Sequence, residues 1–473
     1  MKKIFLLLFI SISFIACTDF EGWNIDTKNP SVVPAETLVS NAEKMLAIRM
    51  QSTSVNYNIF RMLAQHWTET TYTDEANYDL RGRDIGGNFW ANMYDLLNDL
   101  KSAKQLIEED QTIPAQTKAN QLAIISVLNS YSFHILVDTF GHVPYSESLN
   151  SDILTPVYDI DSDIYNDIFN KLDAAISTFS NGGSSFGSAD LFYGGDVAAW
   201  KKFANSLKLR MALRIASVNP SLSTTKANEA VSSGVFTSNA DNFVFNFLSA
   251  PPNTNPVWVS LVQSGRTDFV VANTIVDKMN SLNDPREQFY FDNNVTPYVG
   301  GVYGANNNFS VYTHIGTMLH QPDFPGELMS YSEVEFLLAE AAERSIIGTP
   351  ADAELHYNKG IEASILSWGG TNGDVSAYLA QPSVAYSTAA ATWEEKIGTQ
   401  KWLALYNRGF EAWTSYRIFG YPSMNVPPIS LESVPRRYVY PNDEPDRNGT
   451  NYNTASQLLG GDLKSSKVFW DVN

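Results

Sequence analysis

The sequence predicts a mostly α-helical protein in which paired helices form a scaffold and a loop-rich segment interrupts it. Apolar residues recur every three or four positions in several long stretches, which indicates amphipathic helices. Some of these stretches follow one another across a short turn, as in helical hairpin repeats. Between positions 181 and 329, in contrast, Gly, Pro and Asn are frequent, which favours loops and short strands.

The first clear helix pair lies in the N-terminal half of the chain. Residues 117–137 place Leu122 and Ile125 on one helical face together with later apolar residues. A second helix is predicted to begin at Asp161, a good N-cap residue, and to run to Phe179 before a pair of glycines. The two stretches together predict one helical hairpin.

Further helix pairs are predicted nearer the C-terminus. Residues 331–342 form one amphipathic stretch, 348–350 form a turn, and a second stretch follows with Ala353 and Tyr357 on one face. An Ala followed four positions later by Tyr, in a unit of about 34 residues, fits a tetratricopeptide-type repeat. Residues 393–416 predict another unit. Weaker candidates lie at 35–50 and 88–108. We therefore expect four imperfect tetratricopeptide-like units.

The expected organisation is one helical domain with a long insertion. Its parts are a helical scaffold over about 35–180 and 330–420, a loop-rich insertion over about 181–329 and a loop-rich tail over about 421–473. Within the insertion, only 198–215 and the stretch near 270–282 are predicted to be helical. Uncharged loops on a rigid helical frame commonly carry ligand sites. We therefore expect the ligand surface on these loops.

The N-terminus has the pattern of a bacterial lipoprotein signal. Two lysines, an apolar run that ends at Ile15 and a small residue at Ala16 precede Cys17, the single cysteine of the 473-residue chain. The apolar run is shorter than the roughly 20 residues that a membrane-spanning helix needs. We expect cleavage after residues 1–16, lipidation of Cys17 and a mature chain over 17–473. The alternative is an ordinary signal peptide with an incidental cysteine.

The charge of the chain excludes some partners. The net charge is -19, and removal of residues 1–16 takes away two lysines and no acid, which gives -21. Such an acidic surface repels nucleic acid and anionic lipid headgroups. No nucleic-acid partner is therefore expected, and the acyl chain on Cys17 is the expected attachment to a membrane.

Four short motifs resemble the SusD/RagB family of Bacteroidetes outer-membrane lipoproteins. They are Gly141-His142-Val143-Pro144-Tyr145-Ser146-Glu147, Thr155-Pro156-Val157-Tyr158-Asp159, Glu335-Phe336-Leu337-Leu338-Ala339-Glu340-Ala341, and Gln400-Lys401-Trp402-Leu403-Ala404-Leu405-Tyr406 followed by Glu411-Ala412-Trp413. They occur in the family's order, and the likeness extends from about residue 20 to 473. Asp19 and Glu21 also resemble the family's signal for the outer leaflet.

The resemblance implies a SusD-like fold and a binding function without catalysis. Such a protein is anchored by lipid in the outer membrane and faces the cell exterior. It binds oligosaccharides and delivers them to a SusC-like TonB-dependent transporter, and some members bind peptides instead. The tetratricopeptide-like units are implied to be scaffold and transporter contact, with the ligand held by loops. Trp402, Tyr406 and Trp413 then belong to the scaffold core.

Two clusters of aromatic and polar residues are candidates for the ligand site. A pyranose ring packs an apolar face on Tyr or Trp, while its hydroxyls bind planar polar groups. The first cluster is Trp67, Tyr72, Tyr78, Arg81, Arg83, Asp84, Asn88 and Trp90, and the second is Trp258, Gln263, Arg266, Asp268, Tyr298, Tyr303, Asn306 and Asn307. The first corresponds to the family's ligand-contacting loop in its first repeat. For each aromatic residue the alternative is core packing or a solvated loop.

Metal and catalytic functions have weaker support. The six histidines form no HExxH pattern, no zinc site can be built from a single cysteine, and no cofactor fingerprint occurs. A structural calcium ion is one hypothesis for an acidic loop, against simple solvation. Its candidate ligands are Asp284, Glu287, Asp292, Asn293 and Asn294. Three functions remain open: glycan binding, peptide binding by the same architecture, and, least favoured, a surface glycoside hydrolase.

Overall fold

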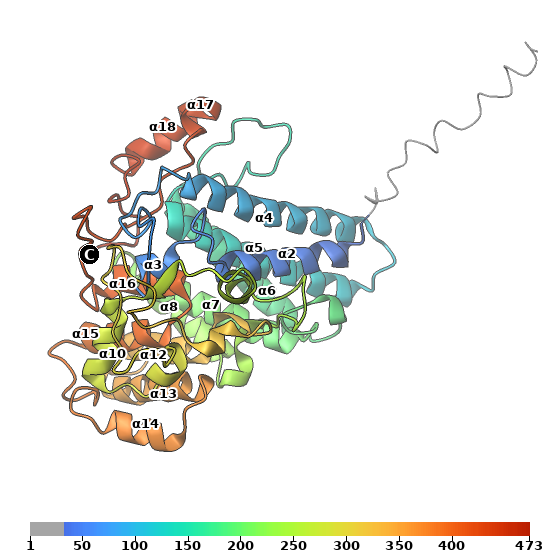
Figure 1. Cartoon of the computed structure of the whole chain (residues 1–473). Coiled ribbons are helices and arrows are strands. Elements are labelled where there is room, and N and C mark those ends of the chain that lie inside the picture. The colour runs from blue at the N-terminus through green and yellow to red at the C-terminus, as the bar shows by residue number, and fades with distance from the viewer. Residues whose placement is uncertain (1–32) are drawn as a thin grey trace, which may run out of the picture.

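The computed structural model describes residues 33–473 and is mostly helical, as predicted (Figure 1). The expected signal peptide, Cys17, Asp19 and Glu21 lie outside the described residues. The longer helices are α2 (Ala35–Gln51), α4 (Ile85–Glu109), α5 (Ala115–Phe140), α6 (Asp161–Phe179), α7 (Val197–Arg214), α8 (Pro220–Ser233), α10 (Asn273–Leu282), α12 (Tyr331–Glu343), α13 (Ala353–Ser367), α14 (Asn372–Leu379), α15 (Trp393–Ala404), α16 (Gly409–Phe419) and α18 (Gly449–Leu458). Short helices are α3 (Phe60–Leu63), α9 (Pro256–Trp258), α11 (Glu287–Tyr290) and α17 (Glu444–Arg447).

The scaffold consists of helices that pack in pairs along the chain. α2 packs on α4, α5 on α6, α7 on α8, and α12 on α13, while α4–α5 and α6–α7 contacts join successive pairs. Further along, α15 packs on α12, α13 and α16. This arrangement agrees with stacked helical hairpins, in which each pair buries its apolar face against the next. Figure 1 shows α4, α5 and α2 running alongside one another.

The α7/α8 hairpin lies inside the segment that we expected to be rich in loops. α8 begins at Pro220 with Asn219 as its N-cap, whose side chain accepts a hydrogen bond from the Leu222 amide at 3.2 Å. Its buried face is made of Ser223, Ala227 and Ala230. Because these side chains are small, α8 has no periodic pattern of large apolar residues. The scaffold therefore continues to about residue 233.

Helix α5 forms the centre of the N-terminal part. By length and composition it could cross a membrane, with a mean hydropathy of 1.3, but 83% of that apolar window is buried within the protein. A helix that is apolar on all sides and covered by its neighbours is a core helix. The neighbours of α5 include α4, α6 and α7.

A network of buried ion pairs connects helices that are far apart in the sequence. Glu333 on α12 accepts hydrogen bonds from Nε and Nη2 of Arg210 on α7, at 2.6 and 2.8 Å, and also pairs with Arg408. Glu411 on α16 pairs with Arg214. Burial alone would raise the pKa of Glu333, but Arg210 and Arg408 outweigh it and lower the pKa below its usual value. Glu333 therefore stays ionised.

The predicted aromatic core is confirmed. Trp402, Tyr406 and Trp413 are almost completely buried. Each polar atom has a partner: Trp402 Nε1 donates to the Ala64 carbonyl at 2.9 Å, Trp413 Nε1 to that of Pro435 at 2.7 Å, and the Tyr406 hydroxyl to that of Tyr290 at 3.1 Å.

Two small antiparallel sheets involve the insertion, and the first of them links it to the segment between α2 and α4. In the first, β1 (Trp67–Glu69) pairs with β3 (Phe269–Val271), with Glu69 opposite Phe269. In the second, β2 (Phe243–Phe245) pairs with β4 (Gly326–Met329). The β1–β3 pairing brings the loop after the first scaffold helix beside the insertion, and the principal cavity lies at this junction.

Candidate ligand-binding site

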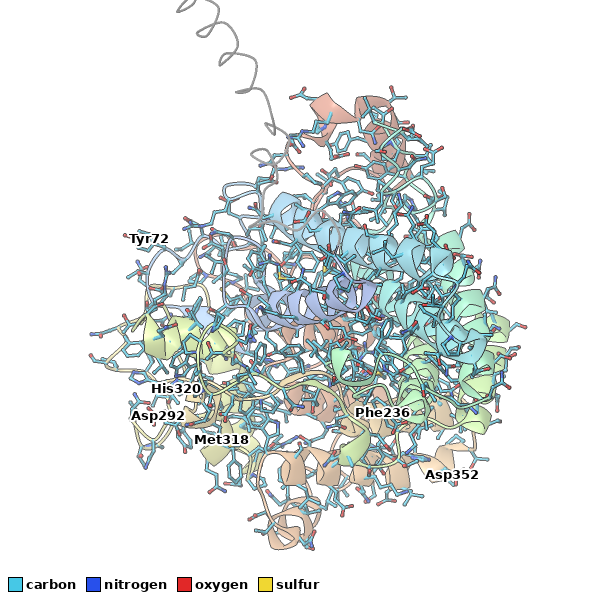
Figure 2. All side chains as sticks on the ribbon, turned by 90° about the vertical axis from the view of Figure 1, so that its right-hand side faces the viewer. Tyr72, Phe236, Asp292, Met318, His320 and Asp352 are labelled. Atoms are coloured by element: carbon cyan, nitrogen blue, oxygen red, sulfur yellow. The ribbon has the colours of Figure 1, made fainter. Side chains whose placement is uncertain are left out.

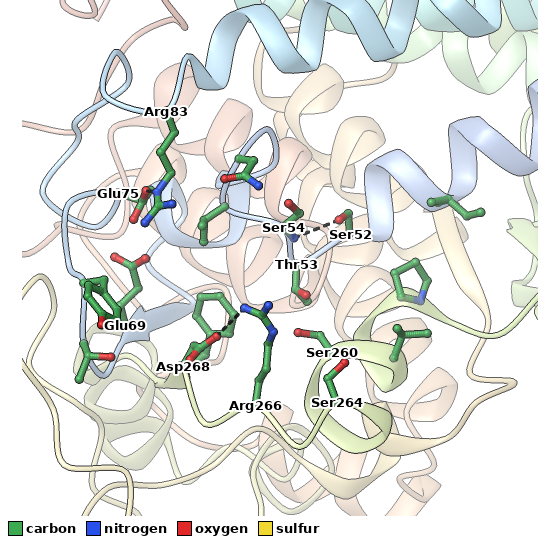
Figure 3. A pocket seen from close by; sticks show the side chains of 18 of the residues that line it. Ser52, Thr53, Ser54, Glu69, Glu75, Arg83, Ser260, Ser264, Arg266 and Asp268 are labelled. Carbon is green, nitrogen blue, oxygen red and sulfur yellow. Dashed lines mark hydrogen bonds and ion pairs between the residues drawn. The ribbon is translucent and has the colours of Figure 1, made fainter. Parts of the chain in front are cut away.

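A cavity of about 650 Å³ opens where three chain segments meet (Figure 3). These are the turn after α2, the loop that follows β1, and the segment around α9 that leads into β3. Its lining is Ile48, Ser52, Thr53, Ser54, Val55, Asn56, Glu69, Thr71, Tyr72, Glu75, Arg83, Pro252, Thr254, Pro256, Val259, Ser260, Ser264, Arg266, Asp268 and Phe269. A volume of this size accommodates a small oligosaccharide or a drug-sized molecule.

Hydrogen bonds at the end of the small sheet hold two of these segments together. The Thr70 amide donates to the Asp268 carbonyl at 2.9 Å, and the Thr70 hydroxyl donates to the Thr267 carbonyl at 2.8 Å. These bonds extend the β1–β3 ladder by one residue. The loop after β1 and the start of β3 therefore form one wall of the cavity.

Polar groups line the cavity in two ion-paired sets. Arg266 Nη1 donates to Asp268 Oδ2 at 3.1 Å, and this pair is largely exposed. Arg83 pairs with Glu75, whose side chain is buried. Guanidinium forks and carboxylates at fixed positions can bind the hydroxyls of a sugar from both the donor and the acceptor side. Hydroxyls of Ser52, Thr53, Ser54, Ser260 and Ser264 line the same cavity (Figure 3).

Tyr72 stands at the rim of this cavity. Its side chain is 78% exposed, and Figure 2 shows it projecting outward at the edge of the molecule. Its backbone φ is 55°, in the left-handed region that non-glycine residues rarely adopt. Such conformations are found in functional loops more often than elsewhere. An exposed aromatic ring beside polar groups is the arrangement that packs on a sugar face.

Glu69 lies at the inner wall, next to Glu75. Its Oε2 accepts a hydrogen bond from the Ala76 amide at 3.0 Å. Burial, and secondly the neighbouring Glu75 carboxylate, raise the pKa of Glu69 to about 9. At neutral pH Glu69 is therefore protonated.

The raised pKa of Glu69 gives a testable dependence of stability on pH. The unfolded carboxyl loses its proton near 4.5 and the folded one near 9, so the stabilisation declines as pH rises between these values. In Glu69→Gln the side chain is always neutral. The free energy of unfolding of this variant should match that of the wild type at low pH and exceed it by about 1–3 kcal/mol near pH 9. Urea unfolding at both pH values measures the difference. Glu354→Gln, at an exposed site on α13, is the control. If the difference in unfolding free energy between Glu69→Gln and the wild type were the same at both pH values, the raised pKa of Glu69 would be contradicted.

Of the residues proposed from the sequence, Tyr72, Arg83 and Arg266 line the cavity together, and Asp268 joins them. Gln263 is exposed in the π-helical turn Val259–Gln263, beside the lining residues Val259 and Ser260.

Three proposed aromatic residues lie in the core instead. Trp67, Tyr78 and Tyr303 are at most 2% exposed. Trp67 Nε1 donates to the Tyr406 hydroxyl at 3.1 Å, and the Tyr303 hydroxyl donates to the Met62 carbonyl at 2.8 Å. Their polar atoms are occupied inside the protein, so these three residues contribute to packing and do not contact the cavity.

The remaining residues proposed from the first cluster have local structural partners. Arg81 pairs with Asp462 at 2.9 Å, and Asp84 caps α4 by accepting from the Gly87 amide at 3.3 Å. Asn88 donates to the Arg83 carbonyl at 2.9 Å. Trp90 is half-buried, with ring centroids of Tyr94 and Phe140 both 5.1 Å away.

In the second cluster, Trp258 is half-buried in α9, and Tyr298 is half-buried with its ring centroid 5.3 Å from that of Phe291. Asn307 is buried and donates to the Glu69 carbonyl at 2.8 Å, while Asn306 is exposed. None of these four is among the residues that line the cavity described above.

Several lining residues were not proposed from the sequence. They include the hydroxyl run Ser52, Thr53, Ser54 and the carboxyls Glu69 and Glu75. The one available signal was the run of small polar residues directly after an amphipathic helix, which also fits an ordinary turn.

Two of the acids proposed as calcium ligands have other partners. Both carboxylate oxygens of Asp284 bind the Arg286 guanidinium, at 2.8 and 2.5 Å, and Oδ2 also accepts from the Tyr378 hydroxyl at 2.9 Å. Asp292 lies 3.9 Å from a ring nitrogen of His314. Across residues 33–473, no three His, Cys, Asp or Glu side chains are grouped so that they could hold a metal ion.

A second cavity, about 600 Å³, lies between α4, α5 and α6. Tyr145 is in its lining, but Lys171 Nζ lies over that ring at 4.5 Å from its centroid, and Phe133 packs edge-on at 4.6 Å. The ring is therefore not free for stacking, in contrast to Tyr72. The first cavity is the better candidate for a sugar.

The fold and the first cavity define a protein of paired helices that carries a polar cavity with Tyr72 at its rim. The model of the SusD-like family, described as starch-binding associating with outer membrane, matches residues 27–441. The chain belongs to this family. The family's description names starch binding and association with the outer membrane.

Solved structures of similar proteins cover nearly the whole chain. A chitin-binding protein is 28% identical with a TM-score of 0.80, covering 93% of this chain and 100% of its own. A SusD homolog from Bacteroides uniformis is also 28% identical, with a TM-score of 0.79 and coverage of 92% and 99%. A chitin-binding SusD homolog from Flavobacterium johnsoniae is 26% identical, with a TM-score of 0.77 and coverage of 92% and 99%. No curated protein matches the chain.

Proposed function

We propose that this protein is a cell-surface lipoprotein that binds oligosaccharides and delivers them to a SusC-like TonB-dependent transporter in the outer membrane. The observation that carries the binding function is the exposed Tyr72 ring above a cavity lined with hydroxyls, carboxylates and guanidinium groups. Ring stacking supplies affinity, and the polar wall supplies orientation. Family membership supports the same function.

The similar structures suggest which ligands to test first. Two of them are described as chitin-binding, and the family description names starch. A panel of chitin and starch oligosaccharides is therefore the first choice, with peptides as the comparison. Affinities in the micromolar to millimolar range, about -8 to -4 kcal/mol, would suit a protein that must release its ligand to a transporter.

Loss of the Tyr72 ring should weaken glycan binding. Tyr72→Ala is expected to lower affinity about tenfold, because one stacking surface of roughly 1.4 kcal/mol is removed. Stability should hardly change, since the side chain is exposed. Calorimetric titration measures the affinity, and Leu154→Ala, an 88% exposed residue in the α5–α6 loop, is the control. Unchanged glycan affinity in Tyr72→Ala would place the site elsewhere; a peptide ligand without any glycan ligand would contradict the proposed substrate class.

Anchoring and delivery are tested in cells. Cys17→Ala should release the protein from the outer membrane, since lipidation at that residue is the proposed attachment. Co-purification from membranes should recover a large TonB-dependent transporter with the wild-type protein. Retention of Cys17→Ala in the membrane fraction without a transporter would contradict the proposed anchor.

A further inference from the structure

The cavity lining contains one carboxyl group that no cation balances. Its acids are Glu69, Glu75 and Asp268, and its cations are Arg83 and Arg266. Arg83 pairs with Glu75, and Arg266 pairs with Asp268. Glu69 remains, with a side chain only 3% exposed and a single bond from the Ala76 amide. A buried carboxylate without a cationic partner is costly, so such a group favours either a proton or a cationic ligand.

A second observation concerns Glu75, whose carboxyl group is hydrogen-bonded to that of Glu69. Glu75 is 1% exposed and lines the cavity. Arg83 binds its Oε1, and among residues 33–473 its Oε2 meets no donor other than the protonated carboxyl of the neighbouring Glu69. Figure 3 shows the Glu69 and Glu75 carboxyl groups and Arg83 on the same wall. A buried acceptor without a partner loses free energy until a donor reaches it. The two carboxyl groups therefore offer several acceptor atoms to a group that replaces the proton between them.

The charged groups around Glu69 leave it without a cationic partner of its own. The loop after β1 contributes Asp74, Glu75 and Arg83, and the β3 side contributes the paired Arg266 and Asp268. The turn after α2 contributes the uncharged Ser52, Thr53, Ser54, Val55 and Asn56. Burial and the neighbouring acids raise the pKa of Glu69 to about 9, so the free protein holds a proton where the ligand's charge would lie.

Resting on the function proposed above, we infer that this wall selects glycans that carry a free amine, with the ammonium group bound between Glu69 and Glu75. On binding, Glu69 gives up its proton to solvent, and N–H groups of the ammonium donate to the two carboxylates. The cavity keeps the same net charge before and after. Among glycans, a free amine is the group that brings both a positive charge and three donors to this position.

The test compares two oligosaccharides of equal length, a glucosamine oligomer and its N-acetylated counterpart. Because binding of the amine expels a proton, its affinity should rise up to about tenfold per pH unit between roughly pH 6 and 7.5. The acetylated oligomer should show no such slope. Titration of the wild type in two buffers of different ionisation enthalpy should show about one proton released per amine bound.

Glu69→Gln keeps the shape of the side chain and removes the exchangeable proton. We expect it to abolish both the pH slope and the proton release, and to lower the ratio of the affinity for the glucosamine oligomer to that for the acetylated oligomer at least about tenfold near pH 7.5. Glu354→Gln is the matched control. Circular dichroism verifies the fold of each variant, and the wild-type proton count tests the inference without any substitution.

The outcomes separate this inference from the function on which it rests. Equal, pH-independent affinities of the wild type for both oligomers would overturn the amine preference, while a loss of binding in Tyr72→Ala would still support glycan binding. A lysine-containing peptide that binds with the same pH slope, while neither oligosaccharide binds, would overturn both proposals.

Discussion

Replacing Glu333 with glutamine is expected to lower the free energy of unfolding by about 3–5 kcal/mol. Its side chain is completely buried and binds two arginines, Arg210 on α7 and Arg408 before α16. The substitution removes the negative charge that pairs with two buried guanidinium groups. The cost of burying these groups away from water is then no longer compensated. Since the volume is unchanged, the effect isolates charge from packing.

Urea unfolding near neutral pH measures this loss. The control is Glu108→Gln on α4, which removes an exposed pair with Lys104 at 3.7 Å and should cost less than about 0.5 kcal/mol. Equal losses in the two variants would show that the buried network contributes no more than a surface pair. A change in the m-value would indicate that the unfolding reaction itself has changed.

The second large effect is expected at Gly409, where α16 begins against α3. A methyl group on Gly409 would lie 2.5 Å from the Phe60 carbonyl carbon and 2.7 Å from the Arg61 Cα. These are backbone atoms, which cannot rotate aside as a side chain can, so the two helices must separate. Gly409→Ala should therefore destabilise the protein by about 3 kcal/mol.

The matched control is Gly449→Ala, at the start of α18, where the added methyl group meets nothing within 4 Å. This substitution should change the free energy of unfolding by no more than about 1 kcal/mol. Alanine restricts the unfolded chain more than glycine does, and this restriction contributes to stability. Urea midpoints of both variants measure the contrast. If Gly409→Ala lowered the free energy of unfolding only slightly, α3 would be able to move away from α16 without loss of packing.

The scaffold was predictable where large apolar residues mark a helix face. The predicted stretches 117–137 and 161–179 correspond to α5 (Ala115–Phe140) and α6 (Asp161–Phe179). The α8 helix was not predicted, because alanine and serine on its buried face leave no contrast between apolar and polar positions.

The site was less predictable, because local composition does not show which way a ring points. Tyr72 and Tyr78 lie six positions apart, and both have left-handed backbones. One is exposed at the rim, while the other is buried and accepts a hydrogen bond from Gln65 Nε2 at 3.0 Å. Contacts between distant segments decide the difference, as the bond from Trp67 to Tyr406 also shows.

The buried charge network also bears on how the stack of hairpins reaches its native order. Helical hairpins with similar apolar faces could associate out of sequence, and apolar contacts alone would penalise such mispairing weakly. Arg210, Glu333 and Arg408 come from three separate parts of the chain, and Glu333 pairs with both arginines when these parts meet. A pairing that separates Glu333 from these arginines leaves buried charges without their partners, which is costly. The network thus favours the native order of the hairpins in two ways. It stabilises the correct contacts between helices, and it makes incorrect contacts between them less stable.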